Sequence, residues 1–309
     1  MNTDLRPGTE FDLVRRLLAR WRDRADGIGD DGVVLFGLDG GKTVISTDAS
    51  VENVHFRRDW LEPREIGYRA TAAALSDLAA MAASPLAILL ALTIPESWKA
   101  DVDAIADGIG EAAEQSGARI VGGDLSEGRD LAIVVTVIGT AERTLTRSGA
   151  RVGDRVYVTG RLGGPGAAVA ALTNGRRPSR DERQRFAHPI PRIREAQWLA
   201  AHGATAGTDV SDGLVADLEN IAVASGHGIV LDLDRVPVMA SVSSRDAAAS
   251  GEEYELAITA SNALDTKVFE AEFGVPLTEI GKVDDGNRGV VTFENGVEVK
   301  PPAGYVHFT

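Results

Sequence analysis

Residues 63–95 read PREIGYRATAAALSDLAAMAASPLAILLALTIP, an Ala-rich segment joined by Ser84-Pro85 to a mostly apolar run. Proline disfavours a helix at the residue before it, so the pattern predicts a helix over 63–83 and a buried strand over 86–93. The uncharged part reaches the length of about 18 residues that a membrane-spanning helix needs. Pro85 interrupts it, however, and we expect no association with a membrane.

The rest of the chain continues this mixture of helices and strands. Apolar spacing and turn residues predict further helices over 10–24, 99–116, 166–172, 193–201 and 214–224, and strands over 33–37, 43–47, 119–121, 131–140, 155–159, 228–233, 255–259 and 290–293. Residues 173–185, TNGRRPSRDERQR, are predicted to form a polar surface segment. A break near 142–150 predicts two domains, 1–145 and 146–309, in a mixed α+β fold.

The composition excludes several kinds of protein. The chain of 309 residues has 32 basic and 46 acidic side chains, a net charge of −14 and no cysteine. Disulfides, zinc–thiolate sites and cysteine nucleophiles are therefore excluded, and the reducing cytoplasm is the expected location. An acidic surface repels nucleic acids, so we expect no nucleic-acid partner, and an anionic ligand would need cations between itself and the protein.

Two glycine-rich stretches imitate nucleotide-binding motifs. In GLDGGKT (37–43) the first glycine is one position too close for a P-loop, and a β-like run follows where a P-loop needs a helix, so a hairpin turn is predicted. VTGRLGGPG (158–166) lacks the second strand with an acidic residue that a dinucleotide-binding fingerprint requires. We interpret it as a connection between a strand and a helix.

Aspartates recur where predicted elements end. They occur in Gly29-Asp30-Asp31, Ser46-Thr47-Asp48, Ser76-Asp77, Gly122-Gly123-Asp124 and Asp209-Val210-Ser211-Asp212. One such motif alone is usually a turn or a helix cap, because Asp and Ser bond their own backbone there. Together they are typical of loops that converge on one site. Carboxylates and hydroxyls are hard oxygen ligands, so the set predicts several Mg²⁺ ions that bridge the protein to a polyphosphate.

Several segments, in this order along the chain, carry a resemblance to a known family. They are GIGDD (27–31), STD (46–48), VENVHF (51–56), LSDLAAM (75–81), VGGD (121–124), TRSGARVGDRVYVTG (146–160), HPIPR (188–192), DVSDGLVADL (209–218) and GEEYEL (251–256). They resemble the thiamine-monophosphate kinase family, within the superfamily of aminoimidazole ribonucleotide synthetase and selenophosphate synthetase. The resemblance implies a two-domain α+β architecture of mixed sheets with helices packed on one face. Residues 1–145 would then bind metal and ATP and form a dimer, and residues 146–309 would form the C-terminal α+β domain.

The resemblance also implies an activity. A cytoplasmic homodimer would use ATP and Mg²⁺ to phosphorylate thiamine monophosphate to thiamine diphosphate by direct in-line transfer. The acceptor is itself an anionic phosphate, so no general base is needed to create a nucleophile. Positioning and the neutralisation of charge would therefore supply most of the catalysis.

Roles for individual residues follow from the same resemblance. Mg²⁺ would be held by Asp30, Ser46, Thr47, Asp48, Asp77, Asp124, Asp209 and Asp212. The candidate catalytic residues among these are Asp48, Asp77 and Asp212. The nucleotide would contact Gly123, Asp124, Arg147 and Ser211, and the thiamine moiety would contact His55, Glu252 and Tyr305.

The sequence departs from the family pattern at three places. The usual Gly-Glu-Asp is Gly251-Glu252-Glu253, Asn53 replaces a frequent glycine, and a tyrosine often found near Ala106 is absent. Two alternatives therefore remain, a superfamily enzyme with another acceptor and a non-catalytic homologue that binds nucleotide and metal. The absence of cysteine disfavours selenophosphate synthetase and the hydrogenase-maturation member as the first alternative, and a turnover assay distinguishes the second.

Overall fold

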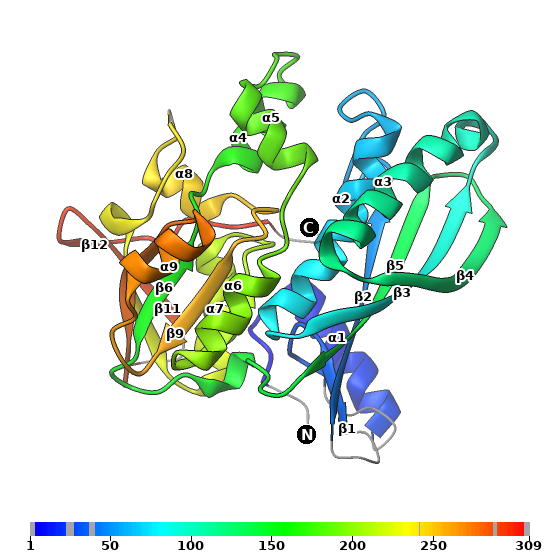
Figure 1. The fold of residues 1–309 in the computed structure, drawn as a ribbon. Helices are drawn as coiled ribbons and strands as arrows, with labels where there is room; N and C mark the ends of the chain where they lie inside the picture. The colour runs from blue at the N-terminus through cyan, green and yellow to red at the C-terminus, as the bar shows by residue number, and fades with distance from the viewer. Residues whose placement is uncertain (1–3, 23–27, 37–40, 241, 287–288, 306–309) are drawn as a thin grey trace.

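A computed structural model describes residues 4–22, 28–36, 41–240, 242–286 and 289–305 of the protein (Figure 1). Its helices are α1 (Thr9–Trp21), α2 (Pro63–Ala80), α3 (Val102–Ser116), α4 (Gly164–Thr173), α5 (Arg180–Ala187), α6 (Ile193–Ala201), α7 (Leu214–Ser225), α8 (Ser244–Ala249) and α9 (Thr266–Phe273). Its strands are β1 (Val33–Phe36), β2 (Lys42–Val51), β3 (Ser84–Ile94), β4 (Arg119–Glu127), β5 (Ala132–Ala141), β6 (Arg155–Thr159), β7 (Ala204–Asp209), β8 (Gly228–Asp232), β9 (Leu256–Ala260), β10 (Leu277–Asp284), β11 (Gly289–Glu294) and β12 (Val297–Val299). These strands form two separate sheets, one in each half of the chain.

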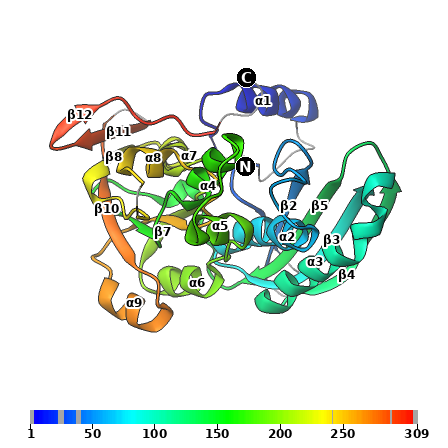
Figure 2. The same cartoon turned by 90° about the horizontal axis from the view of Figure 1, so that it is seen from above.

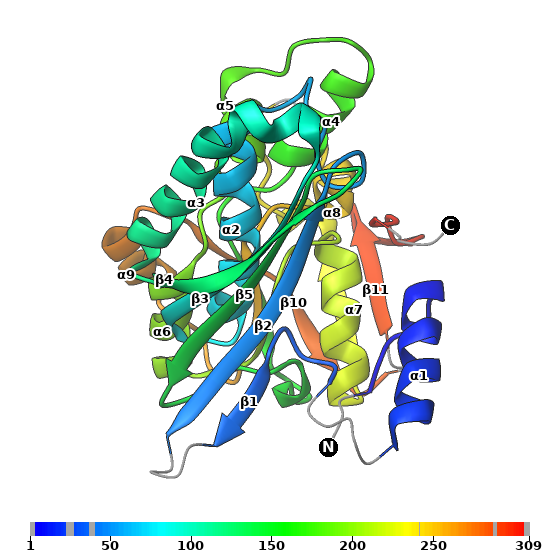
Figure 3. The ribbon, with the colours of Figure 1, turned by 90° about the vertical axis from the view of Figure 1, so that its right-hand side faces the viewer.

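The first sheet has one face in the core and one face open. Its strand order is β1-β2-β5-β3-β4, in which every neighbouring pair is antiparallel except β3 and β4, which are parallel. Buried side chains such as Ile88, Val135 and Val137 point to the face on which α2 and α3 pack. Figure 3 shows the opposite face, which no described helix covers.

The second sheet has helices on both faces. Its strand order is β12-β11-β8-β10-β6-β9-β7. Successive residues of β6 point to opposite sides, so Val156 packs with α7 in one core while Tyr157 packs with α6 and α9 in another. Figure 2 shows α7 and α9 on opposite sides of these strands. The expected two-domain α+β architecture is confirmed. The expectation of helices on one face holds for the first sheet, whereas the second has helices on both faces.

Helix α2 lies between the two sheets and touches both cores. Its Leu75 and Leu78 belong to the core of the first sheet, whereas Ala79 packs with residues of the second. Helix α3 approaches α2 so closely that a Cβ atom on Gly67 would lie 2.1 Å from the carbonyl oxygen of Ile105. Glycine is therefore required at this helix crossing. Residues near the C-terminal end of α2 consequently face both halves of the molecule.

Most predicted elements are present, but α5, α8, α9, β7, β10 and β12 were not predicted, and β4 runs beyond its predicted end. Residues 173–185 were predicted to be a polar surface segment, but α5 begins at Arg180 within them. Strands β1 and β2 pair as the predicted hairpin, whose turn residues 37–40 lie outside the described residues, as do 23–24 of the first predicted helix. Across the described ranges, no helix combines the length and apolar character needed to cross a bilayer.

Candidate active site

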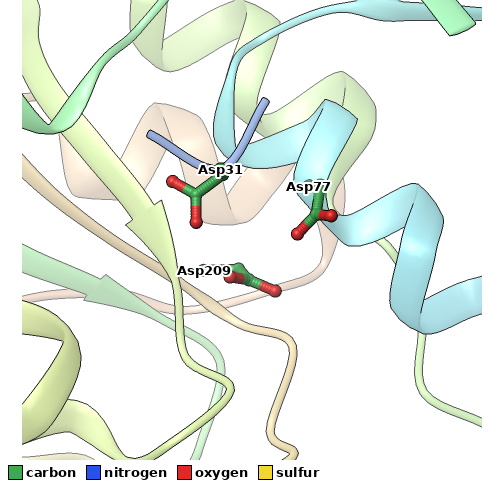
Figure 4. A group of neighbouring side chains, drawn as sticks. All are labelled: Asp31, Asp77 and Asp209. Carbon is green, nitrogen blue, oxygen red and sulfur yellow. The ribbon is translucent and has the colours of Figure 1, made fainter. Parts of the chain in front are cut away.

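Three acidic side chains from distant parts of the sequence meet where the two halves join (Figure 4). Asp31 precedes β1, Asp77 lies near the end of α2, and Asp209 is the last residue of β7. One carboxylate oxygen of each lies within 4.8 Å of the corresponding oxygens of the other two. Because all three donors are hard oxygens at this short spacing, the cluster has the chemistry of a divalent-cation site.

Hydroxyl groups hold two of these carboxylates in place. Ser46 Oγ, on β2, donates a hydrogen bond to Asp77 Oδ2 at 2.5 Å. Ser76 Oγ, on α2, donates to Asp209 Oδ2 at 2.6 Å and so links the first half of the chain to the second. Both hydroxyls therefore fix their carboxylate through its Oδ2 atom.

The electrostatics of the cluster require a compensating positive charge. Burial raises the pKa of Asp77 well above its usual range, and the neighbouring carboxylates of Asp209, Asp48 and Asp31 raise it further. Burial and the charge of Asp31 raise the pKa of Asp209 to about 7, although Arg147 opposes them. At neutral pH these groups must therefore hold protons or cations.

Arg147 supplies part of the positive charge. Its Nη2 donates to Asp31 Oδ1 at 2.5 Å and its Nη1 to the carbonyl oxygen of Gly29 at 3.3 Å. The backbone N–H of Arg147 donates to Asp30 Oδ1 at 2.7 Å. Asp31 Oδ1 also accepts from Thr208 Oγ1 at 3.2 Å, whereas its Oδ2 is buried without a hydrogen-bond partner among the described residues. That oxygen is the free electron-pair donor that a metal ion would use.

Asp31 is a functional candidate that the sequence analysis missed. Asp30 was expected to be the metal ligand of the GIGDD motif, but the structure brings Asp31 to Asp77 and Asp209 and turns Asp30 toward the backbone of Arg147. The only signal in the sequence was that two aspartates stand side by side. Neighbouring side chains point in different directions, and the sequence alone does not say which of the two faces the site.

Strand β2 sends its site residues to two different faces of the first sheet. Its register with β5 puts Ser46 and Asp48 on the side of the helices, beside the buried Val137 and Val135. Thr47, between them, points to the open side, where its Oγ1 lies 2.9 Å from Thr136 Oγ1. Thr47 therefore cannot join the acidic cluster of its own chain.

Strand β4 also carries predicted nucleotide and metal residues away from the cluster. A Cβ atom on Gly123 would lie 1.9 Å from the carbonyl oxygen of Leu90, so this position requires glycine. Asp124 lies on the open face and accepts a hydrogen bond from Ser126 Oγ at 3.2 Å. Asp124 on β4 is three strand spacings, about 14 Å across the sheet, from β2, which carries Asp48.

The loop after β7 is fixed by an acid that the sequence analysis also missed. Asp217 Oδ2, in the first turn of α7, accepts hydrogen bonds from the backbone N–H groups of Ser211, Asp212 and Gly213 at 3.0, 3.1 and 3.1 Å. Its place a few residues after the predicted ligands was the available signal. These bonds hold the backbone of the predicted nucleotide residue Ser211.

Asp212 lies in this loop and has partners from both ends of the chain. Arg6 Nη2 donates to Asp212 Oδ2 at 3.0 Å. The carbonyl oxygen of Asp212 accepts from the N–H of Tyr305 at 2.8 Å. A predicted metal ligand and a predicted thiamine contact are thus brought together.

Glu252 meets the same loop from the other side. Its N–H donates to the carbonyl oxygen of Ser211 at 2.6 Å, and its carboxylate forms an ion pair with Arg69 of α2. His55 lies in the loop after β2, where its Nδ1 accepts from the N–H of Val51 at 3.1 Å. Of the three predicted thiamine contacts, the structure therefore places Glu252 and Tyr305 around one loop.

Two of the departures from the family pattern have a local explanation. Asn53 has φ 64°, in the left-handed region that glycine favours and asparagine tolerates. Glu253 is fully buried and faces away from Glu252, with its Oε1 accepting from the N–H of Gly163 at 2.6 Å and from Ser250 Oγ at 2.5 Å. The longer side chain is used in packing within the second domain.

Comparisons with known proteins match both halves of the chain. The protein family described as "AIR synthase related protein, N-terminal domain" matches residues 29–141. The family described as "AIR synthase related protein, C-terminal domain" matches residues 151–294. Thiamine-monophosphate kinase of Salmonella typhimurium is 36% identical over 323 residues, which cover 97% of this chain and 98% of that protein.

Solved structures agree as well. One described as AaThiL complexed with AMPPCP and TMP has a TM-score of 0.84 and 29% identity, covering 97% of both chains. Thiamine-monophosphate kinase from Stenotrophomonas maltophilia has a TM-score of 0.77 and 32% identity, covering 94% of this chain and 98% of that one. With such identity and coverage, and with two matching domains, the chain belongs to the thiamine-monophosphate kinase family.

Proposed function

We propose that the protein transfers the γ-phosphoryl group of ATP to the phosphate of thiamine monophosphate and releases thiamine diphosphate and ADP. The observation that carries this proposal is the cluster of Asp31, Asp77 and Asp209, which adjoins the loop that Glu252 contacts. An anionic donor and an anionic acceptor can meet only where their charge is neutralised. Membership of the family and the similar structure of AaThiL complexed with AMPPCP and TMP support the choice of substrates.

Magnesium fits the donor set of this site. All cluster atoms are carboxylate oxygens, and the unpartnered Asp31 Oδ2 is available as a ligand. Asp31, Asp77 and Asp209 would hold one or more ions together with Ser46, Asp48 and Asp212, and Asp30 remains a predicted ligand. Mg²⁺ bound here would neutralise and orient the phosphate oxygens.

The protein's own residues would fix the reacting groups. Ser46 and Ser76 orient the carboxylates of Asp77 and Asp209, so little reorganisation is needed when charge builds up. Arg147 and the backbone held by Asp217 would position the nucleotide phosphates near the same acids. No side chain needs to remove a proton, because the acceptor oxygen is already anionic.

The acceptor would lie along Glu252 and Tyr305. The half-exposed ring of Tyr305 is suited to stacking on a cationic thiazolium, and a carboxylate is suited to bonding amino groups. His55 is proposed to complete this side of the site. These contacts would leave the acceptor phosphate pointing toward the acids.

A homodimer would complete the nucleotide site. Thr47 and Asp124 lie on the open face of the first sheet, where the partly exposed apolar side chains of Leu89, Val134 and Ile138 are also found. A second copy packed on this face would bury the apolar side chains and bring Asp124 of one chain toward Thr47 of the other, the neighbour of Asp48 along β2. The distance of about 14 Å within one chain supports this arrangement.

Two further proposals concern the domains and the location of the protein. The division at 145/146 is supported by the segment between β5 and β6, which ends the first sheet before the second begins. Action in the cytoplasm is in keeping with the cysteine-free sequence.

³¹P NMR of the purified protein with ATP, Mg²⁺ and thiamine monophosphate tests the function. Thiamine diphosphate and ADP should appear in equal amounts, and neither should appear when EDTA is added or the acceptor is omitted. ATP consumption that does not depend on thiamine monophosphate would point to another acceptor. Binding of ATP without turnover would contradict the proposed activity.

A further inference from the structure

Arg69 is a buried cation that no expected role in the site requires. It lies on α2, is only 3% exposed, and its one ion-pair partner among the described residues is Glu252. Its Nη1 donates to the carbonyl oxygen of Phe186 at 2.8 Å, and its guanidinium carbon lies 4.4 Å from the centre of the Phe186 ring. A buried charge is costly unless it is paired, so this arrangement fixes the guanidinium and, through it, the Glu252 carboxylate.

The backbone around Glu252 has its own supports and does not depend on Arg69. The N–H of Glu252 bonds to Ser211, and the N–H of Tyr254 bonds to Val210 at 2.9 Å. Gly251 lies so close to the loop after β7 that an added Cβ atom would be 2.7 Å from the carbonyl oxygen of Ser211. What Arg69 adds is the direction of the Glu252 side chain, which is 29% exposed and would otherwise rotate freely.

The same helix that carries Arg69 also carries Asp77 of the cluster and Ser76, which holds Asp209. Ser76 and Asp77 follow Arg69 by two helical turns, a rise of about 10 Å. Ser76 bonds to Asp209, and Asp77 lies in the cluster. Helix α2 therefore sets a fixed distance between the carboxylate that would bind the acceptor's ring system and the acids that would surround its phosphate.

We propose that Arg69 is a positioning residue for the acceptor: it orients the Glu252 carboxylate by engaging Oε1, so that Oε2 can bond an amino group of the acceptor's ring system. This inference rests on the proposed function. It predicts an effect confined to one substrate, because Arg69 reaches the acceptor through the Glu252 carboxylate, whereas the backbone of the nucleotide residue Ser211 is held by Asp217 and by the N–H of Glu252. A merely structural role would affect both substrates alike.

Steady-state kinetics with each substrate varied in turn test the proposal. Arg69→Met should raise KM for thiamine monophosphate about tenfold or more, the usual effect of losing a hydrogen bond to a charged group, and leave KM for ATP nearly unchanged. Arg69→Lys, which keeps the charge, should restore much of the affinity. The matched control is Arg64→Met on the same helix, whose ion pair with Glu111 is solvent-exposed at 2.9 Å; both its KM values should stay near those of the wild type.

A double-mutant cycle with Glu252→Gln separates coupling from general damage. If Arg69 acts through Glu252, adding Arg69→Met to Glu252→Gln should raise KM for thiamine monophosphate little further. The proposal would be overturned if the rise in KM for thiamine monophosphate in the double variant equalled the product of the rises in the two single variants. Equal rises of KM for ATP and for the acceptor would also overturn it. If Arg69→Met does not fold, the same cycle is run with Arg69→Gln, which removes the charge but keeps a polar side chain. Wild-type protein without kinase activity would overturn the proposed function and this inference with it, whereas an active wild type with unchanged KM values in the variants would overturn this inference alone.

Discussion

At the scale of single residues, Asp77 is surrounded by the negative charges of the other carboxylates in the site. Burial and three neighbouring carboxylates all raise its pKa. Asp77→Asn should lower the rate of phosphoryl transfer by about two orders of magnitude or more, because an amide cannot supply the negative charge that binds the metal. Asparagine can still accept the hydrogen bond from Ser46, so the fold should survive. Stopped assays with saturating substrates measure the rate.

The stability of the same variant provides the control. Without divalent metal, Asp77→Asn should melt at the same temperature as the wild type or higher, since one of the repelling charges is gone. Added Mg²⁺ should raise the melting temperature of the wild type more than that of the variant. Glu114→Gln, at an exposed carboxylate of α3, should leave both rate and Mg²⁺ response unchanged. A Mg²⁺ response of Asp77→Asn equal to the wild type's would contradict the metal role.

Glu253 predicts a dependence of stability on pH. Burial raises its pKa to about 7, against the opposing effect of Arg185. The folded state therefore keeps the proton to higher pH than the unfolded state, whose carboxyl titrates near 4.5. The stabilisation is fully present below pH 4.5 and is lost as the pH rises through 7, an effect of roughly 3 kcal/mol at 1.36 kcal/mol per pKa unit.

Urea unfolding at several pH values between 5 and 8 measures this effect. The free energy of unfolding of the wild type should fall across this range, and the fall should be smaller in Glu253→Gln, which cannot ionise. Gln can still accept the bonds from Gly163 and Ser250, so the variant should fold. Equal slopes for the two proteins would mean that Glu253 is already ionised in the folded state at pH 5.

The sequence predicted which kinds of side chain form the site, but it did not predict the direction in which each side chain points. The recurring Asp and Ser motifs indicated an acidic metal site, and the structure does bring Asp77 and Asp209 together. The sequence did not distinguish Asp30 from Asp31, because both fit the motif and only the path of the chain turns one of them inward. Asp217 was missed because its bonds go to backbone N–H groups, which every residue carries.

At the scale of elements, α5 depends on a capping box at its first turn. Ser179 Oγ accepts from the N–H of Glu182 at 3.3 Å, and Glu182 Oε2 accepts from the N–H of Ser179 at 2.7 Å. Ser179→Ala should lower the free energy of unfolding by about 1 kcal/mol, whereas Ser179→Asp, which can still cap, should stay near the wild type. Urea titration measures both. Equal losses in the two variants would show that the cap does not stabilise the fold.

The same helix illustrates which elements the sequence could predict. Helices and strands with clear apolar periodicity were identified, because burial of one face specifies both their type and their position. Helix α5 was missed because its residues are mostly charged, and the S-x-x-E signal of Ser179 and Glu182 was overlooked. Strand β7, ATAGTD, was missed because it is short and poor in β-branched residues, and β4 continues through the glycine pair that was expected to end it.

At the scale of the whole molecule, the first sheet separates the proposed site into two groups of residues. Ser46 and Asp48 face the helices and the acidic cluster, while Thr47 and Asp124 face the open side. One chain alone offers no route by which Asp124 reaches the row of Asp48, since two strands lie between β2 and β4. If Asp124 serves the same site, we expect it to come from a second copy whose β4 meets the open face at Thr47, next to Asp48 along β2.

Mixing two inactive variants tests this arrangement. Asp48→Asn and Asp124→Asn should each lose activity as homodimers, because every site then lacks one carboxylate. If the two residues serve one site from different copies, each mixed dimer has one site with both residues intact and one with neither. Random exchange of subunits should then restore about a quarter of the wild-type activity. Mixing each variant with itself is the control, and light scattering confirms that dimers re-form. No recovery after verified exchange would mean that both carboxylates act within one chain. A nucleotide bound to both would then have to pass the edge of the first sheet.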